Sequence, residues 1–302
     1  MQAISPDVAS AGMIRSFLFV PADSERKLAK AGDCGADALI LDLEDSVRAE
    51  ARPDARRMAR EYLLGKENAW VRINPIDGDD AIADLEGVMP SAPAGIVLPK
   101  PRSAAAAVEL AARLSELESR HQIEPGRTQI ISLCTERPEA LFTLNSYVAS
   151  TERLLGLSWG AEDLSAALGA AANRDDEGNW LPTYEMARSM CLLAASAAEV
   201  VAIDTVFTDF KNTEGLRHYA TKARRDGFSG MLAIHPAQVD IINAAFTPTQ
   251  AELEHAERIV ELFAANPDAG TIGMDGKMID RPHLVQAKRL LNVARQVKSR
   301  GQ

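Results

Sequence analysis

Eight short apolar runs, separated by stretches patterned as helices, constrain the fold of this 302-residue chain more than any other feature. They lie at Ile14–Val20, Ala38–Asp42, Ala69–Ile73, Gly95–Pro99, Gln129–Cys134, Leu154–Ser158, Val200–Val206 and Met231–Ile234. Most of them are continuous rather than alternating in polarity, which is typical of parallel strands covered on both faces. The chain is therefore predicted to alternate between strands and helices.

Eight such repeats most simply close into a (β/α)8 TIM barrel of the α/β class. An open doubly wound sheet is the rival, but no G-x-G-x-x-G follows the first run and no G-x-x-x-x-G-K-[ST] occurs. The length and the 46% of hydrophobic residues suit one barrel with an appendage. We predict a flexible arm at residues 1–13, a barrel at 14–265 and a C-terminal helical lid or arm at 266–302.

The end of the chain exceeds what a barrel needs. Thr249-Gln250-Ala251-Glu252 is a capping-box pattern that opens a helix reaching about Ala265. A Gly-rich turn at Gly270–Gly276 and a final helix follow. This tail is predicted to act as a lid or as an arm exchanged between subunits.

Charge and cysteine content narrow the class of protein. A formal net charge of −10 argues against a nucleic-acid partner, because it implies no basic surface to replace phosphate counterions. The 3 cysteines are far apart and form no C-x-x-C pair, so neither a disulfide framework nor a zinc site is indicated. No run reaches the roughly 18 apolar residues that a membrane span needs. We expect a cytoplasmic protein without a membrane partner.

Polar residues follow nearly every predicted strand. In a (β/α)8 barrel the active site lies at these C-terminal strand ends, so the residues are expected to meet at one mouth. They combine carboxylates suited to a cation with basic groups suited to an anion. They are Pro21, Asp23, Glu44, Asp45, Arg72, Asn74, Lys100, Glu136, Glu162, Asp163, Asp204, Asp209 and His235.

Two acidic motifs stand directly after predicted strands. Thr135-Glu136 follows one run, and Glu162-Asp163 lies within the Trp159–Asp163 segment that follows the next. Carboxylates from successive strands, with water and substrate oxygens, suit a hard divalent cation. The motifs predict a metal-dependent enzyme.

Seven blocks of the sequence carry a family resemblance. In order they are Arg15–Pro21 (RSFLFVP), Leu41–Val47 (LDLEDSV), Val71–Asn74 (VRIN), Thr135-Glu136, Trp159–Leu164 (WGAEDL), Gly227–Gln238 (GFSGMLAIHPAQ) and Gly276–Pro282 (GKMIDRP). Together they resemble the citrate lyase β-subunit-like (CitE-like) family of the HpcH/HpaI aldolase superfamily, which includes malyl-CoA and citramalyl-CoA lyases.

The resemblance implies a magnesium-dependent carbon–carbon lyase that joins or separates an acetyl-type acyl-CoA and a 2-oxo acid through an enolate. Glu136 and Asp163 fall where the family holds Mg²⁺, for which Mn²⁺ can substitute, and Glu136 also faces the substrate. Arg72 falls on its substrate-binding arginine, and Asp280 on a C-terminal acid delivered across a subunit boundary. The positions that resemble the wall of the CoA site are Phe19, Val20, Lys30, Ile234 and His235.

Physical chemistry supports these roles, but each residue has a second interpretation. Arg72 is suited to a developing oxyanion, and it could also brace strand ends through Glu44 or Asp45. These two acids are expected to orient Arg72 or metal-bound water. Asp280 is either the general acid/base or the cap of a helix that starts near Pro282.

Three further residues at the predicted mouth each have two interpretations as well. Glu162 could replace Asp163 as the metal ligand, because adjacent residues point in different directions. Lys100 either sets the potential of the site or is solvated. His235 is either a proton-transfer group or a packed hydrogen-bonding residue.

Three functions fit this sequence. The leading one is a free-standing lyase acting on a malyl-, citramalyl- or citryl-type thioester. The second is a hydrolase of a malyl-CoA-like thioester that uses the same metal site. The third is a citrate lyase β subunit that depends on an acyl-carrier protein, which the retained tail with Asp280 disfavours. On the resemblance, a homotrimer or homohexamer is expected.

Overall fold

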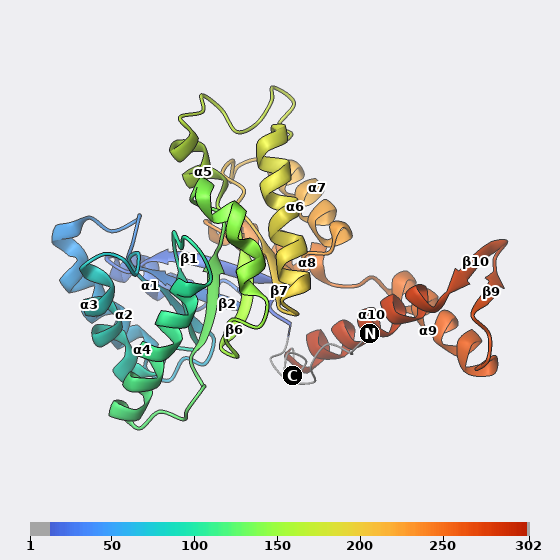
Figure 1. The fold of residues 1–302 in the computed structure, drawn as a ribbon, viewed down its shortest axis with the longest axis horizontal. Helices are drawn as coiled ribbons and strands as arrows, with labels where there is room; N and C mark the ends of the chain where they lie inside the picture. Colours follow the sequence, from blue (N-terminus) through green and yellow to red (C-terminus); the bar gives the residue numbers. More distant parts are fainter. Residues whose placement is uncertain (1–12, 301–302) are drawn as a thin grey trace.

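The computed structural model describes residues 13–300, in which eight parallel strands close into a barrel (Figure 1). The strands follow the chain order without exception, β1 to β8, and β8 pairs with β1. They are β1 Ser16–Pro21, β2 Ala38–Asp42, β3 Ala69–Arg72, β4 Gly95–Leu98, β5 Gln129–Leu133, β6 Leu154–Ser158, β7 Val201–Asp204 and β8 Gly230–Ala233. The predicted (β/α)8 barrel is confirmed.

Helices connect successive strands on the outside of the barrel (Figure 1). The α-helices are α1 Glu25–Ala31, α2 Arg52–Leu63, α3 Asp80–Val88, α4 Ala105–His121, α5 Ala161–Leu168, α6 Pro182–Ala197, α7 Thr213–Asp226 and α8 Val239–Phe246. Four segments are 3₁₀-helices: η1 Ala49–Ala51, η2 Met89–Ser91, η3 Pro138–Tyr147 and η4 Pro236–Gln238. Of these, η3 is the connection between β5 and β6.

The strands bury side chains on both faces. In β1, Phe17 packs inside the barrel, whereas Leu18 and Val20 pack in the layer between the barrel and its helices. The inner cluster also contains Trp70 and Ile131. Burial on two sides explains why the strand sequences are continuous apolar runs rather than alternating ones.

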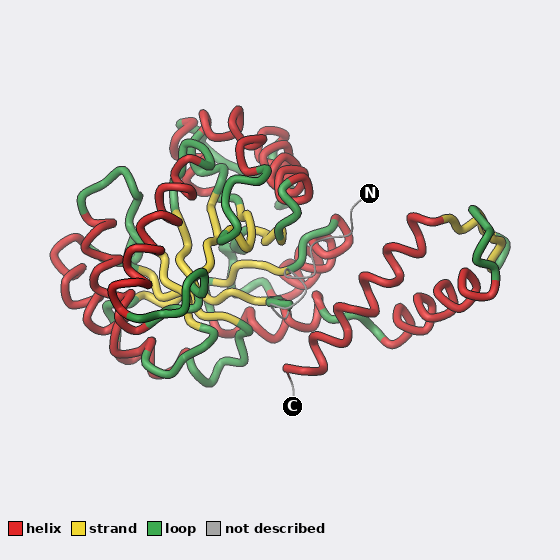
Figure 2. The backbone as a smooth tube through the Cα atoms, turned by 60° about the horizontal axis from the view of Figure 1, so that its bottom comes forward, coloured by secondary structure: helices red, strands yellow, loops and turns green. Residues whose placement is uncertain are grey.

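The C-terminal part of the chain forms an arm that projects from the barrel (Figure 2). It consists of α9 Gln250–Ala265, a hairpin of β9 Thr271–Met274 and β10 Lys277–Asp280, and α10 Arg281–Arg300. The hairpin lies at the end of the arm farthest from the barrel (Figure 2).

The arm has an apolar cluster of its own. Ile259 and Phe263 of α9 are buried against Met274 and Ile279 of the hairpin and Leu284 of α10. Our division at residue 265 therefore separated α9 from the elements on which it packs. An amphipathic pattern shows that a helix has an apolar face but does not show which element covers that face.

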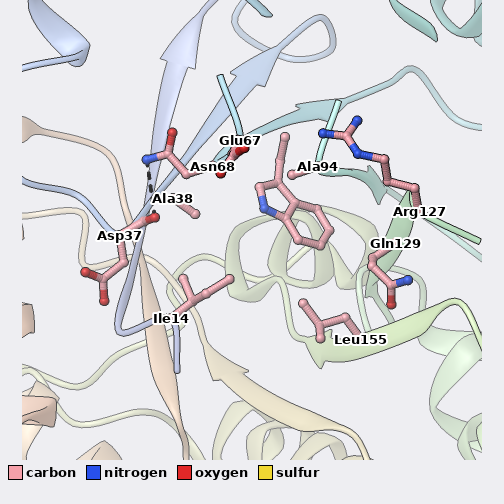
Figure 3. A pocket seen from close by; sticks show the side chains of 10 residues that line it. Ile14, Asp37, Ala38, Glu67, Asn68, Ala94, Arg127, Gln129 and Leu155 are labelled. Atoms are coloured by element: carbon pink, nitrogen blue, oxygen red, sulfur yellow. Dashed lines mark hydrogen bonds between the residues drawn. The ribbon is translucent and has the colours of Figure 1, made fainter. Parts of the chain in front are cut away.

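A small cavity of about 260 Å³ lies at the N-terminal ends of the strands (Figure 3). Apolar side chains, among them Ile14, Trp70 and Leu155, line it together with the charged Asp37, Glu67 and Arg127. In this fold the N-terminal end of the barrel serves stability rather than catalysis. Within residues 13–300, no helix is long and apolar enough to cross a membrane.

Candidate active site

A cavity of about 420 Å³ lies at the C-terminal ends of the strands, where (β/α)8 barrels place their active sites. Acidic side chains, one arginine and several apolar side chains surround it. Its lining consists of Phe19, Pro21, Asp42, Asp45, Ser46, Arg72, Leu133, Glu136, Trp159, Gly160, Ala161, Glu162, Asp163, Thr205, Val206, Leu232 and Ile234. The structure thus brings Arg72, Glu136 and Asp163 around one cavity.

Arg72 is fixed by Asp42 on the neighbouring strand. The two residues are paired in register at the ends of β3 and β2. Nε and Nη2 of Arg72 donate to the two carboxylate oxygens of Asp42 at 2.7 and 2.8 Å. Nη1 lies 3.0 Å from Glu44 and 3.4 Å from Asp45. The guanidinium also stacks on Phe19, 4.7 Å from the ring centroid.

The charges of this pair are mutually stabilised. Burial raises the pKa of Asp42, but Arg72 and the hydrogen bonds from Ser46 and Glu44 together lower it more, so the pKa stays below its usual value of 3.8. Burial lowers the pKa of Arg72, but Asp42 together with Glu44 and Asp45 outweighs burial and raises it. Burial raises the pKa of Glu44 to about 7. The nearby Arg72 and Lys100 lower it, but by less than burial raises it, and both cations also pair with other carboxylates. Arg72 is therefore a permanent cation held by acids.

Glu136 is buried at the mouth of the barrel, three residues beyond β5. Its Oε2 accepts a hydrogen bond of 2.5 Å from the backbone N–H of Lys100. Gly160 leaves the space that this side chain fills, because a β-carbon there would lie 2.5 Å from Glu136 Cγ. Burial, together with the nearby Asp163 and Glu44, raises the pKa of Glu136 well above its usual value. A bound cation would reverse that penalty.

Asp163 and Glu162 lie in the first turn of α5, directly after β6. Lys100 Nζ lies 3.2 Å from Asp163 Oδ1. Glu162 Oε1 instead accepts a hydrogen bond of 3.0 Å from Asn173 Nδ2. The two neighbouring acids thus have different partners, although both line the cavity.

The donors suit a hard cation that the protein holds through few ligands. Glu136 and Asp163 offer carboxylate oxygens, the ligands that Mg²⁺ prefers. Across residues 13–300 no group of three or more Asp, Glu, His and Cys side chains is arranged as a metal site. Two carboxylates completed by water and substrate oxygens remain the arrangement that fits these residues.

Trp159 forms part of the cavity wall and is fixed from behind. It is fully buried, and its Nε1 donates to Asp204 Oδ1 at 2.7 Å. Asp204 also accepts hydrogen bonds of 3.0 and 2.8 Å from Nε and Nη2 of Arg188. This buried network anchors the segment that carries Gly160 and Asp163.

Of the five residues expected at the CoA site, two line the cavity and three do not. Phe19 and Ile234 line the cavity, and Ile234 is partly exposed there. The side chain of Val20 packs in the outer apolar layer, and Lys30 is exposed on α1. His235 Nδ1 accepts a hydrogen bond from the Ala237 N–H as part of a capping box. Its ring also stacks on Phe210, with the centroids 4.9 Å apart.

Asp280 lies on the arm, apart from the cavity of its own barrel. It ends β10 in the hairpin at the far end of the arm (Figures 1 and 2). Every residue that lines the cavity comes from positions 19–234. Asp280 Oδ1 is 2.5 Å from His283 Nδ1, and its side chain is 33% exposed. Asp280 would reach such a cavity only on another copy of the chain.

Sequence reasoning missed Asp42 as the main partner of Arg72. We named Glu44 and Asp45 for that role, but the bidentate contact belongs to Asp42. Asp42 and Arg72 are the last residues of adjacent strands. Their positions at the ends of two successive apolar runs were the signal in the sequence that could have indicated the pair. Trp159 and Gly160 belong to the WGAEDL block, but the sequence alone did not indicate that they shape the cavity and make room for Glu136.

Comparison with known proteins agrees with this geometry. The sequence pattern described as HpcH/HpaI aldolase/citrate lyase matches residues 15–236. The chain belongs to this family. It is 35% identical over 278 residues to a citrate lyase subunit beta-like protein of Mycobacterium tuberculosis, covering 92% of this chain and 94% of that one. It is also 33% identical to a (3S)-malyl-CoA thioesterase of Cereibacter sphaeroides, with coverages of 92% and 93%.

A solved structure of the HpcH/HpaI aldolase/citrate lyase family extends the comparison to the fold. It is CitE of Mycobacterium tuberculosis in complex with magnesium, acetoacetate and coenzyme A. It superposes with a TM-score of 0.80 at 34% identity, over 94% of this chain and 98% of that chain. The cofactors expected from the sequence, Mg²⁺ and CoA, are those bound in that homologue.

Proposed function

We propose that this protein is a Mg²⁺-dependent acyl-CoA lyase that cleaves or forms the bond between an acetyl-type acyl-CoA and a 2-oxo acid. The proposal rests on the observation that Glu136, Asp163 and Arg72 line one cavity at the C-terminal ends of the strands. The two carboxylates suit a metal, and the fixed guanidinium suits an anionic substrate beside it.

In this proposal Glu136 and Asp163 hold the metal, which orients and polarises the carboxylate and hydroxyl or oxo oxygens of the substrate. Arg72 is held at Nε and Nη2 by Asp42, so its position does not depend on the substrate. Nη2 has a second hydrogen, which we assign to the developing thioester oxyanion or the substrate carboxylate. In the cleavage direction water at the site takes the hydroxyl proton, the C–C bond breaks to give the 2-oxo acid and the enolate, and the enolate carbon takes up a proton.

We assign the proton transfer at that carbon to Asp280 of a neighbouring subunit. The arm holds Asp280 away from its own barrel, and a carboxylate that is sequestered when a lid closes can act as an acid or base. We accordingly propose a homotrimer or homohexamer with sites shared between subunits. A cytoplasmic location fits the three free cysteines. An acyl-carrier partner is not favoured, because the chain keeps its own arm.

The test is to incubate the protein, Mg²⁺ and acetyl-CoA with glyoxylate, pyruvate or oxaloacetate and to identify the condensation product by mass. We expect one acceptor to give a product that disappears with EDTA and in Glu136→Ala and Asp163→Ala. Glu162→Gln is the matched control and is expected to retain activity, because Glu162 bonds to Asn173. Full activity after metal removal would refute the proposal.

A thioesterase is the second candidate, because a relative at 33% identity is a (3S)-malyl-CoA thioesterase. Both reactions would use the same metal and the same cavity. With a malyl-CoA-type substrate, the lyase releases acetyl-CoA and a 2-oxo acid, whereas the hydrolase releases free CoA and the hydroxy acid. Thiol release without glyoxylate or pyruvate would favour the thioesterase.

A further inference from the structure

Lys100 joins both halves of the proposed metal site. Its backbone N–H donates to Glu136 Oε2 at 2.5 Å, and its Nζ lies 3.2 Å from Asp163 Oδ1. The same ammonium lies 2.5 Å from Glu44 Oε1 and 3.0 Å from Asp45 Oδ1. One residue therefore contacts four carboxylates at the mouth of the barrel.

The backbone of Lys100 adopts a conformation that few non-glycine residues take. Its φ is +50°, in the left-handed region, and it stands between Pro99 and Pro101. A residue before proline normally prefers extended backbone. Such strain is kept where surrounding contacts impose it, and it occurs often at functional sites. Here the conformation turns both the N–H and the ammonium toward the acids.

The ion pairs around the cavity divide between Arg72 and Lys100. Arg72 pairs with Asp42, Glu44 and Asp45. In the described part of the chain, the ion pair to Asp163 comes from Lys100. Glu136 is buried, Asp163 is partly buried, and both line the same cavity. The ammonium thus supplies positive charge at a proposed metal ligand.

We infer that Lys100 is a built-in substitute for the divalent cation, which holds Asp163 in the metal-free protein and releases it when the metal binds. The inference rests on the metal site proposed above. Glu44 and Asp45 remain as partners for the ammonium after that release, so the lysine stays charged and close. Lys100 then stabilises the metal-free site while lowering its affinity for the metal, through competition and repulsion.

This role predicts the opposite effect on metal affinity from that of a lysine that merely holds the ligands in place. If Lys100 competes with the metal, Lys100→Met removes a positive charge near the ligands and tightens metal binding. The backbone N–H that binds Glu136 remains in that variant. If Lys100 only positions Asp163, the same change weakens binding.

The experiment titrates wild type and K100M with Mn²⁺ and follows the free ion by electron paramagnetic resonance. We expect the dissociation constant of K100M to fall by about tenfold, as one removed charge at this distance allows. The melting temperature of metal-free K100M should be lower, and its rise on adding Mn²⁺ larger, than in wild type. Lys100→Arg keeps the charge and should lie closer to wild type than to K100M.

Each other outcome overturns the inference. Equal or weaker Mn²⁺ binding by K100M, with normal binding by wild type, refutes the role of Lys100 alone. Absence of binding in wild type and variants refutes the metal site and the proposed function as well. Lys100→Gln, which keeps a hydrogen-bond donor, replaces K100M should K100M not fold. Failure of both neutral variants to fold even at saturating Mn²⁺ would also overturn the inference, because the fold would then require Lys100 whether or not the metal is bound.

Discussion

Asp42 and Arg72 are hydrogen-bond partners in register on adjacent strands, joined by two contacts of 2.7 and 2.8 Å. The backbone N–H groups of Glu44 and Ser46 donate to the same carboxylate at 3.1 and 3.2 Å. Asp42 therefore has little capacity left for a metal, and its function is to hold the guanidinium at the cavity.

Asp42→Asn should cost stability as well as activity. Removing one charge of a buried pair typically costs about 3–5 kcal/mol. The pKa of Asp42 is below 3.8 in the fold, so its stabilisation is present above the unfolded value and is lost as pH falls through the folded pKa. Urea unfolding should show a constant deficit near neutral pH that shrinks in acid. Asp45→Asn is the control, because Asp45 is 52% exposed and should have little effect.

Gly160→Ala should weaken metal binding without altering the metal ligands. The added β-carbon would lie 2.5 Å from Glu136 Cγ, so the buried carboxylate must move. Displacing a supporting contact of a metal ligand typically costs about 10–100-fold in affinity. Calorimetric titration with Mg²⁺ measures the loss. Gly270→Ala, with no atom within 4 Å of the added carbon, should bind Mg²⁺ like wild type.

Metal affinity should depend on pH through Glu136. Its pKa in the fold is raised, so proton and metal compete for the carboxylate, and affinity falls about tenfold per pH unit below that pKa. The metal-free fold also binds this proton more tightly than the unfolded chain does. Its free energy of unfolding should therefore fall as pH rises from the unfolded pKa of 4.5 through the folded pKa.

Glu136→Gln serves as the control for both parts of this expectation. It removes the titrating group, so Mn²⁺ binding should be weak at every pH. Its melting temperature should vary less with pH than that of wild type when both lack metal. A wild-type Mn²⁺ affinity that does not change between about pH 5 and 8 would contradict the prediction.

Asp280→Asn should abolish turnover while leaving Mg²⁺ affinity unchanged, because Asp280 lies on the arm, outside the cavity lining. Co-expression with Glu136→Gln in doubly tagged oligomers tests whether sites are shared. A site with an intact barrel from one chain and an intact arm from the other is active, so mixed oligomers would recover about a third of wild-type activity as trimers and about a quarter as hexamers. Recovery of no activity would place the arm in its own subunit's site or outside catalysis.

Local pattern determined much of the fold. Continuous apolar runs such as Ala38–Asp42 and Leu154–Ser158 became strands, because burial on both faces imposes that pattern on the sequence itself. The order of strands then put Glu136 and Asp163 at one end of the barrel, because parallel strands end on the same side. The capping box at Thr249 is likewise a local signal, and the helix begins there.

The sequence by itself determined the barrel, its family and the acids at its mouth, since each follows from short-range periodicity or motif. Only the tertiary structure decided which acid holds Arg72, where the charge of Lys100 lies and that α9 belongs to the arm. These facts depend on register, backbone conformation and packing between residues far apart in the chain. Such contacts leave no periodic trace in the sequence, because many side chains of the same type could make them.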